Sequence, residues 1–401
     1  MNVWIVNPFD SLPCEGGRPL RFWLMAEAFA KAGHAVSYWT ADFNHVTKRP
    51  RDLAGLDRPS SGGVRVFAAH EPPYFGNIGL RRLWAHWRWA RNWRKAAGND
   101  PPPDLVVVSS PPLAICRSVE DFAAEVGAKV VLDVMDAWPE TFERVAPRWT
   151  LWPLRRMARA NYLGADAITT VADSYVELVR SYGFNGEVRR FYHGISGCGT
   201  AASRASSASR QADAPAAPRR ASVRIRYIGG LGQTYDLTTA VEAVRLLDGL
   251  ATLEIAGKGE QESALRKCGG GVRFVGYLPE RELAAFLSEG DVGLVPMRPE
   301  SCVGIPYKFA DYSRAGLAIV SSLGGESDRL LAKYGAGSAY RAGDPQSLAE
   351  CVRRLADRLD DAKAASRRMA EREFDADAIY AGYVAFAEGV AALRPEARRE
   401  K

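Results

Sequence analysis

The sequence predicts an α/β protein made of two doubly wound, Rossmann-like domains, each built on a parallel β-sheet. Short apolar runs rich in valine and isoleucine recur along the chain, and each is followed by an amphipathic helical pattern. Such runs are typical of parallel strands that helices cover on both faces. The pattern occurs twice, on either side of a segment with almost no large apolar residues. A length of 401 residues also suits two domains of ordinary size.

The predicted strands form two sets. The first comprises NVWIV, AVSYWT, VRVFAA, DLVVVSS, KVVLDVMD and AITTVA, and the second comprises VRIRYIGG, ATLEIAG, VRFVG, DVGLVPM, LAIVSS and GSAYRAG. The stretch between them is rich in alanine, serine and arginine, which is typical of a flexible linker. The sequence therefore predicts an N-terminal domain over residues 1–195, a linker over 196–222 and a C-terminal domain over 223–375.

The remaining segment, 376–401, contains a last helical pattern with a broad apolar face. Such a face needs a partner that buries it. We expect this helix to pack back on the N-terminal domain, and packing on its own domain is the alternative.

Composition and charge indicate a folded protein without a disulfide framework. The net charge of +6 is compatible with an anionic substrate, a membrane surface or nucleic acid. The six cysteines lie far apart and share no metal-type spacing with the five histidines, so we expect reduced thiols, a cytoplasmic protein and no structural zinc. The start MNVWIVNPFD lacks the basic region of a signal peptide, and no apolar run is long enough to span a membrane.

A glycine-rich turn follows the first predicted strand, at the edge where doubly wound sheets bind ligands. Gly16, Gly17 and Arg18 come just before a helical pattern. Exposed amides at a helix start favour an anion, and an arginine adds a charge-assisted contact. A lone Gly-Gly is more often only a turn, and the spacing is not G-x-G-x-x-G, which argues against a nicotinamide or flavin site.

The second half repeats this device several times. Gly230 and Gly232 end the first strand of that half, and Gln233 and Tyr235 follow them into a helix. Two further turns contain Gly257, Lys258 and Tyr277. Glycine turns repeated at the ends of several strands indicate a cleft for a phosphorylated ligand.

The segment 300–322, ESCVGIPYKFADYSRAGLAIVSS, places Lys308 and Asp311 three residues apart on one helical face. Taken alone, this spacing is typical of a solvated ion pair on an ordinary helix. The helix nevertheless lies directly before a strand that is expected to be buried, in the half that carries most of the glycine turns.

Several of these segments resemble the GT-B glycosyltransferases, specifically the retaining family 4 group that builds bacterial surface polysaccharides. In the second half the resemblance rests on YIGGLGQTYDL, LEIAGKGEQESAL, VRFVGYLPERELAAFLSEGDVGLVPM and GIPYKFADYSRAGLAIVSS; in the first it rests on EGGRPLRFWLMAEAFAKAGHAVSYWT, VVVSSPPL and VVLDVMDAWPE. It implies two Rossmann-like domains facing a cleft, an acceptor domain followed by a donor domain. It covers nearly the whole chain apart from the linker and specifies neither sugar.

The resemblance implies roles for the segment that contains Asp311. In that family the Gly-x-Pro segment, here with Ile305 and Pro306, and the following helix lie at the nucleotide sugar. Asp311 stands where the family usually has a glutamate that holds the ribose hydroxyls. Lys308, one helical turn earlier, would face a phosphate.

The sequence also departs from the family pattern. The first glutamate of the family's pair is replaced by Val303, and the basic pair of the first donor loop is replaced by Gln233, Thr234 and Tyr235. Neutralisation of the diphosphate would then depend on backbone amides, helix dipoles and Lys308 or Lys258.

Two residues are catalytic candidates. Asp136 follows a strand in DVMDAWPE, which resembles the family's D-x-W-P-E element, and would orient an acceptor or sugar hydroxyl. The alternative is a helix N-cap with Pro139 in the first turn. His193 closes the predicted first domain and is the second candidate. Retaining transfer does not require the paired carboxylates of glycoside hydrolases.

Residues 79–98, GLRRLWAHWRWARNWRKAAG, combine four tryptophans with six arginines or lysines. A helical wheel places Leu80, Leu83, Trp84, Trp87 and Ala90 on one face, with Trp89 and Trp93 opposite. Tryptophan with arginine suits a membrane interface or a lipid diphosphate headgroup. The alternative is a helix that packs its tryptophans on the sheet. The candidate acceptor and membrane residues are Arg81, Arg82, Trp84, Trp87, Arg88 and Arg91.

The sequence therefore predicts a retaining glycosyltransferase that moves a sugar from a nucleoside diphosphate donor to a lipid-linked saccharide in surface polysaccharide biosynthesis. We expect no cofactor, no metal and no nucleic-acid partner, and a cytoplasmic protein with peripheral contact to the inner membrane face. The alternatives are a nucleotide-sugar epimerase on the same fold and a non-catalytic partner that binds a sugar nucleotide.

Overall fold

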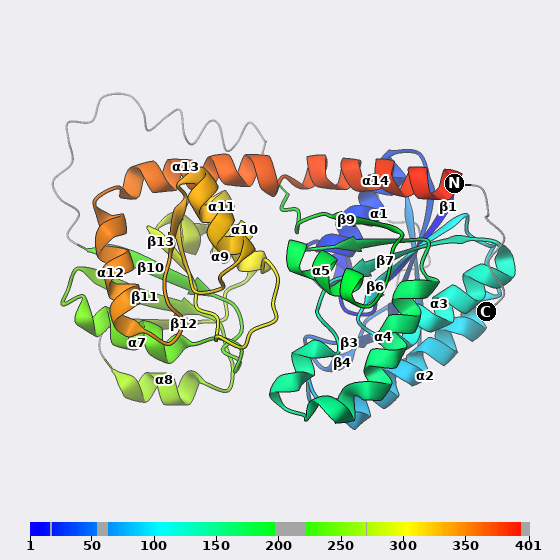
Figure 1. Cartoon of the computed structure of the whole chain (residues 1–401), viewed down its shortest axis with the longest axis horizontal. Coiled ribbons are helices and arrows are strands. Elements are labelled where there is room, and N and C mark those ends of the chain that lie inside the picture. The colour runs from blue at the N-terminus through cyan, green and yellow to red at the C-terminus, as the bar shows by residue number, and fades with distance from the viewer. Residues whose placement is uncertain (17, 54–62, 197–221, 270, 394–401) are drawn as a thin grey trace. The chain divides into compact units, whose positions relative to one another are not determined.

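The computed structural model describes residues 1–16, 18–53, 63–196, 222–269 and 271–393 (Figure 1). The chain divides into two compact units. The first unit comprises Met1–Phe191 together with the chain from Asp377 onwards, and the second comprises Tyr192–Ala376. Gly17 and residues 197–221 of the predicted linker lie outside the described residues.

The first unit is built on a seven-stranded sheet in which every neighbouring pair is parallel. In spatial order the strands are β5 (Val64–Ala69), β2 (Ala35–Ala41), β1 (Asn2–Val6), β6 (Leu105–Ser110), β7 (Lys129–Val134), β8 (Ala167–Thr170) and β9 (Glu187–Arg190). A short antiparallel hairpin, β3 (Phe43–Asn44) and β4 (Arg49–Pro50), follows β2. The hairpin and β9 were missed in the sequence, because they are short and carry polar residues.

Helices flank this sheet (Figure 1). They are α1 (Arg21–Lys31), α2 (Leu80–Ala97), α3 (Leu113–Val126), α4 (Trp152–Gly164), α5 (Asp173–Ser181) and α14 (Ala376–Ala392), with short 3-10 turns η1 (Pro13–Glu15), η2 (Glu140–Arg144) and η3 (Arg148–Leu151). Helix α3 packs on β6 and β7 and contacts both α2 and α4. The predicted strand-and-helix alternation of the first half is therefore present.

A buried ion pair connects the first unit's sheet to helices from both ends of the chain. Arg21 of α1 and Asp133 of β7 are both inaccessible to solvent, and Arg21 Nη2 lies 2.9 Å from Asp133 Oδ2. Thr169 donates to the same carboxylate oxygen at 2.7 Å, and Tyr383 of α14 lies 3.1 Å from the Thr169 hydroxyl. A buried charge pair with these extra hydrogen bonds fixes the packing of α1 and α14 on β7 and β8.

The second unit is built on a six-stranded parallel sheet. In spatial order the strands are β12 (Val272–Gly276), β11 (Ala251–Ala256), β10 (Val223–Ile228), β13 (Val292–Val295), β14 (Ala318–Ser321) and β15 (Gly337–Ala339). The helices are α7 (Leu237–Leu246), α8 (Glu262–Cys268), α9 (Glu280–Ser288), α10 (Tyr307–Ala315), α11 (Glu326–Tyr334), α12 (Pro345–Ala356) and α13 (Leu359–Glu373). Two parallel sheets with alternating helices confirm the predicted fold class.

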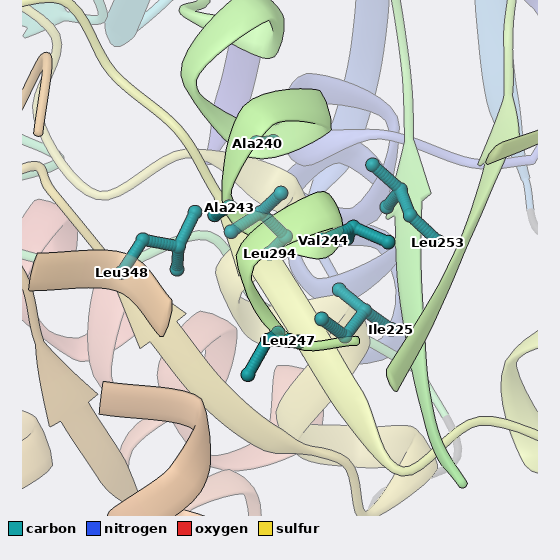
Figure 2. Close-up of a pocket in the computed structure, with 8 residues that line it drawn as sticks. All are labelled: Ile225, Ala240, Ala243, Val244, Leu247, Leu253, Leu294 and Leu348. Carbon is teal, nitrogen blue, oxygen red and sulfur yellow. The ribbon is translucent and has the colours of Figure 1, made fainter. Parts of the chain in front are cut away.

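The second unit's core contains a small void under α7 (Figure 2). Its volume is about 10 Å³, roughly the space of one water molecule. Its lining is entirely apolar: Ile225, Ala240, Ala243, Val244, Leu247, Leu253, Leu294 and Leu348. A water there would find no hydrogen-bond partner, so the void is a packing gap in the core and not a ligand site. None of the described helices combines the length and the apolar character needed to cross a membrane.

Candidate functional site

The glycine turns of the second unit follow neighbouring strands of its sheet. Residues 229–236 follow β10, residues 257–261 follow β11, and the segment that leads into α10 follows β13. We call these turns, with the start of α10, the glycine edge. Ligands of doubly wound sheets bind beyond the carboxyl ends of the strands, so this edge is the candidate ligand site of the unit.

Two turns of the glycine edge pack backbone against backbone. A Cβ atom at Gly257, whose φ is +157°, would overlap the carbonyl oxygen of Gly229. A Cβ at Gly259 would lie 2.7 Å from backbone atoms of Leu231. The Leu231 amide donates to the Lys258 carbonyl at 3.0 Å, which joins the two turns. Only glycine permits this approach, and the first turn is therefore held firmly by the second.

Side chains also hold the first turn through its carbonyl groups. Gln261 Nε2 donates to the carbonyl oxygens of Gly232 and Tyr235, at 2.5 and 3.1 Å, and the Tyr227 hydroxyl donates to that of Gly230 at 2.7 Å. Space is open around the Cβ positions of Gly230 and Gly232. A ligand can therefore approach this backbone closely without displacing a side chain.

Lys308 lies behind the first turn, enclosed by aromatic rings. Its Nζ is 4.1 Å from the ring centre of Tyr227 and 3.6 Å from that of Tyr235. The residue is 6% exposed, and its Nζ has no hydrogen-bond partner among the described residues. Burial lowers the pKa of Lys308 well below its usual value, and the charge of Asp311 acts in the opposite direction. A buried amine without a hydrogen bond is costly, and an anionic ligand would compensate for that cost.

Asp311 is also buried, at 3% exposure. The interpretation of Lys308 and Asp311 as a solvated surface pair is therefore wrong, because neither side chain reaches the surface. Ile305 is buried and Pro306 is the N-cap residue of α10, so the predicted Gly-Ile-Pro entry leads directly into this helix. The Tyr312 hydroxyl donates to the Ile228 amide at 2.9 Å and ties α10 to β10.

His193 lies in the second unit, since the boundary between the units falls after Phe191. Its ring stacks on that of Tyr307 with centres 3.9 Å apart. The structure therefore brings His193 to the first residue of α10, the helix of Lys308 and Asp311. The other predicted donor residues, Gln233, Lys258 and Tyr277, are exposed around the glycine edge.

In the first unit, the loop after β1 is fixed by Arg51. Its guanidinium donates to the carbonyl oxygens of Pro8 and Asp10 at 3.1 and 3.0 Å. The Asp10 carboxylate accepts the Phe22 amide at 3.0 Å, and burial raises the pKa of Asp10 to about 6. Arg18 is half-buried just before α1. The predicted role of Gly17 lies outside the described residues.

Asp136 forms its hydrogen bonds within its own turn. Its Oδ1 accepts the Ala137 amide at 2.9 Å and the Thr141 hydroxyl at 3.2 Å. Burial raises the pKa of Asp136, and these hydrogen bonds and the charge of Arg82 act in the opposite direction. The N-cap position of the following helical turn is Pro139. Asp136 therefore stabilises the turn after β7 without being its N-cap.

Helix α2 divides its tryptophans between the core and the surface. Trp89 and Trp93 are fully buried, and Trp93 meets Trp4 and Trp39 edge to face. Trp84 and Trp87 are 50% and 45% exposed. Helix α2 therefore packs Trp89 and Trp93 in the core, and leaves Trp84 and Trp87 of the predicted apolar face exposed.

The arginines of α2 divide in a similar way. Arg81 and Arg91 are exposed, and Arg91 covers the ring of Trp87 at 4.9 Å. Arg88 is half-buried. Arg82 turns inward, with its guanidinium 5.0 Å from the ring centre of Trp138, 5.5 Å from that of Phe9 and 5.9 Å from that of Tyr74.

Arg82 belongs to a set of polar and aromatic side chains that sequence reasoning missed. They all follow carboxyl ends of β1, β2, β5 or β7, or lie on α2. We call this set the aromatic-cation cluster: Phe9, His45, Lys48, Glu71, Tyr74, Arg82, His86 and Trp138. The available signal was that His45, Lys48 and Glu71 lie shortly after predicted strands, but no motif connects them.

Within the described residues, no group of three or more histidine, cysteine, aspartate or glutamate side chains is placed to hold a metal ion.

Two protein-family models match the chain. The Glycosyl transferase 4-like domain matches residues 16–193, and the Glycosyl transferases group 1 domain matches residues 222–358. Each match falls on one half of the chain, in the order expected of acceptor and donor domains. The chain is a GT-B glycosyltransferase of the family 4 type. The transferase prediction is therefore confirmed, and the epimerase and non-catalytic alternatives have no support from these matches.

Among curated proteins, this glycosyltransferase is similar to the amylovoran biosynthesis glycosyltransferase AmsK of Erwinia amylovora. The two are 28% identical over 176 residues, which is 39% of this chain and 42% of AmsK. The matched region thus spans less than half the length of that relative.

Solved structures share the fold over almost the entire chain. Sucrose-phosphate synthase from Thermosynechococcus elongatus superposes with a TM-score of 0.75 and 14% identity, covering 98% of this chain and 99% of that one. HepE of Anabaena, in complex with UDP and glucose, superposes with a TM-score of 0.66 and 11% identity, covering 98% and 100%. Two-domain similarity at these identities establishes the GT-B fold of this glycosyltransferase.

Proposed function

We propose that this glycosyltransferase transfers a sugar, with retention, from a nucleoside diphosphate sugar to a lipid-linked saccharide during polysaccharide biosynthesis. The second unit would bind the donor and the first the acceptor. The similarity to AmsK supports the polysaccharide context, and the complex of HepE with UDP and glucose supports a sugar nucleotide as donor. Localisation on the inner face of a membrane, without a cofactor or metal, belongs to the same proposal.

One observation supports the donor proposal most strongly: a buried amine lies directly behind open glycine backbone, on the same helix as a buried carboxylate. Gly230 and Gly232 present free space, and Lys308 lies beneath the same turn. A diphosphate over this turn would accept backbone amides and bring negative charge near the unpaired Lys308 amine. Asp311 would accept hydrogen bonds from the two ribose hydroxyls, as a carboxylate with two oxygens is able to do.

The glycine backbone and Lys308 would also help the nucleoside diphosphate to leave. Departure of the nucleoside diphosphate builds negative charge on its terminal phosphate, and fixed amides and a cation stabilise that charge as it develops. Because Lys308 is enclosed by Tyr227 and Tyr235, its amine is held in place before the donor arrives. His193, stacked on Tyr307 at the start of α10, would position the sugar end of the donor.

The experiment that tests this proposal is calorimetric titration of the whole protein with UDP, GDP, dTDP and their sugars, followed by turnover with extracted lipid acceptor. We expect one nucleotide to bind selectively. Asp311→Asn and Lys308→Met should each weaken its binding by about tenfold or more, since each loses a charge-assisted contact. Asp357→Ala is the matched control, because Asp357 is an exposed carboxylate at the end of α12.

Retention is measured separately, from the anomeric configuration of the product by NMR. If the binding nucleotide lost no affinity in either variant, the glycine edge would not be the donor site. Inversion at the anomeric carbon would contradict the retaining mechanism and leave donor binding intact.

A further inference from the structure

The aromatic-cation cluster brings two cations together on one residue. Lys48 Nζ donates to the side-chain oxygen of Asn77 at 2.9 Å, and Arg82 Nη1 donates to the Asn77 carbonyl oxygen at 2.5 Å. Within the described part of the chain, neither cation forms a salt bridge with a carboxylate. Both side chains are half-buried in the first unit, and each donates to an uncharged oxygen of Asn77.

The guanidinium of Arg82 is held rigidly. Three aromatic rings surround it, and its Nε donates to His86 Nε2 at 3.4 Å. An arginine fixed by rings loses little conformational entropy when it binds a ligand, and its planar fork matches the oxygens of a phosphate. Lys48 Nζ lies 4.7 Å from the ring centre of Tyr74, the same ring that Arg82 contacts.

The pKa values of His45 and Lys48 are consistent with a positive electrostatic potential around Arg82 and Lys48. Burial, followed by the charges of Arg82 and Lys48, lowers the pKa of His45 to about 3. Burial and the charge of Arg82 likewise lower the pKa of Lys48 to about 8. Glu71 and Asp136 are the carboxyl groups whose charges act on Arg82. Burial raises the pKa of Asp136, and it raises the pKa of Glu71 to about 8, so Glu71 is largely protonated at neutral pH.

An apolar loop projects beside the cation pair. Phe75, Ile78 and Leu80 flank Asn77 in the sequence and are 72%, 60% and 84% exposed. Large apolar side chains exposed together usually mark an interaction site. A pair of unpaired cations with apolar side chains next to it is complementary to a molecule that has an anionic head and a hydrocarbon chain.

We propose that Lys48 and Arg82 bind the diphosphate of a prenyl-linked acceptor. Phe75, Ile78 and Leu80 contact the first carbons of its hydrocarbon chain. The diphosphate replaces the Asn77 oxygens as the acceptor of hydrogen bonds from both cations. This inference rests on the proposed lipid-linked acceptor and assigns its headgroup to residues of the first unit alone.

The test is titration of the whole protein with farnesyl diphosphate below its micelle concentration. We expect Lys48→Met to weaken binding at least tenfold, and Arg82→Lys, which keeps the charge but loses the planar fork, to weaken it less. The double variant Lys31→Met with Lys95→Met is the matched control, because it removes two exposed charges of the first unit outside the cluster. Circular dichroism verifies that each variant is folded.

Three further measurements separate the possible sources of binding. Farnesol should not bind, and inorganic diphosphate should bind at least tenfold more weakly than farnesyl diphosphate. Equal affinity for inorganic diphosphate would overturn the prenyl part of the proposal, and unchanged farnesyl diphosphate binding in both Lys48→Met and Arg82→Lys would overturn the site. Titration of the same variants with the donor nucleotide distinguishes this failure from failure of the proposed function, since neither residue belongs to the glycine edge.

Discussion

The carboxyl ends of the two parallel sheets present different kinds of groups. At the glycine edge of the second unit, turns approach one another through bare backbone, and Lys308 behind them is enclosed by two tyrosines. In the first unit, the corresponding strand ends carry rings and long charged side chains, and two cations reach Asn77 near the surface. The same sheet architecture therefore supports a site made of amides in one unit and a site made of side chains in the other.

The two sites are therefore expected to tolerate substitutions differently. A site made of backbone depends on the absence of side chains, so it fails when an atom is added. A site made of side chains depends on their charges, so it fails when a charge is removed and responds to pH.

The largest loss of stability is expected from Gly257→Ala. The new methyl group would overlap the Gly229 carbonyl oxygen, and φ at this position is unfavourable for alanine, so the two turns must separate. We expect a loss of about 3–5 kcal/mol in the free energy of unfolding, measured by urea denaturation, together with loss of nucleotide binding.

Gly230→Ala is the matched control in the same edge, because open space surrounds its Cβ position. It should leave the free energy of unfolding within about 0.5 kcal/mol of the parent and reduce only nucleotide binding. Equal destabilisation by both substitutions would show that the close approach of the two turns does not hold the edge.

The sequence predicted the glycine edge better than the aromatic-cation cluster, for a physical reason. Glycines at strand ends are local signals, and the alternation of apolar runs identified the strands they follow. The burial of Lys308 depends on Tyr227 and Tyr235, and the side-chain cluster depends on residues from four strands and one helix, so neither could be seen in a single stretch. Which tryptophans of α2 are buried could not be seen for the same reason, since Trp93 packs on Trp4 and Trp39 of two strands.

A second prediction concerns the pH dependence caused by Glu71. Burial raises the pKa of this carboxyl group from an ordinary 4.5 to about 8 in the folded protein. Between these values the unfolded chain releases the proton while the folded protein keeps it, so stability falls as pH rises. The contribution between pH 5 and pH 8 is on the order of 3 kcal/mol.

Glu71→Gln keeps the shape of the side chain and removes the titration. The difference in free energy of unfolding between parent and variant, measured by urea denaturation at pH 5, 6, 7 and 8, should therefore grow in favour of the variant. Other titrating groups, including His45 and His86, are common to both proteins and cancel in this difference. A difference that is constant with pH would mean that Glu71 is ionised in the folded protein.

The smallest expected effect is on membrane binding by exposed tryptophans of the first unit, of which the sequence indicated only those on α2. Trp84 and Trp87 of α2 are exposed, and the structure adds Trp149 of η3 and Trp152 of α4, at 79% and 61% exposure. Arg156 lies over the Trp152 ring at 5.7 Å, as Arg91 does over Trp87. Tryptophan rings covered by arginine suit the headgroup region of an anionic membrane.

These two pairs of tryptophans are connected through the cluster. Arg82 covers Trp138, whose ring lies 4.6 Å from that of Phe142 in η2, and η2 contacts η3. If the first unit docks on a membrane to reach a lipid headgroup at Lys48 and Arg82, both pairs contribute. Trp84→Ala with Trp87→Ala, and Trp149→Ala with Trp152→Ala, should each reduce sedimentation with phosphatidylglycerol vesicles by about tenfold, roughly 1.4 kcal/mol.

Leu246→Ala, which removes an exposed apolar side chain from the second unit, is the control and should not change sedimentation. Loss in the α2 pair alone would restrict the membrane contact to the helix that the sequence indicated. No loss in either pair, with farnesyl diphosphate binding retained, would mean that the acceptor headgroup reaches the cluster without docking of these tryptophans. The aromatic-cation cluster would then bind a phosphorylated ligand without help from a membrane. The glycine edge is proposed to do the same, and each site uses the groups at the strand ends of its own sheet.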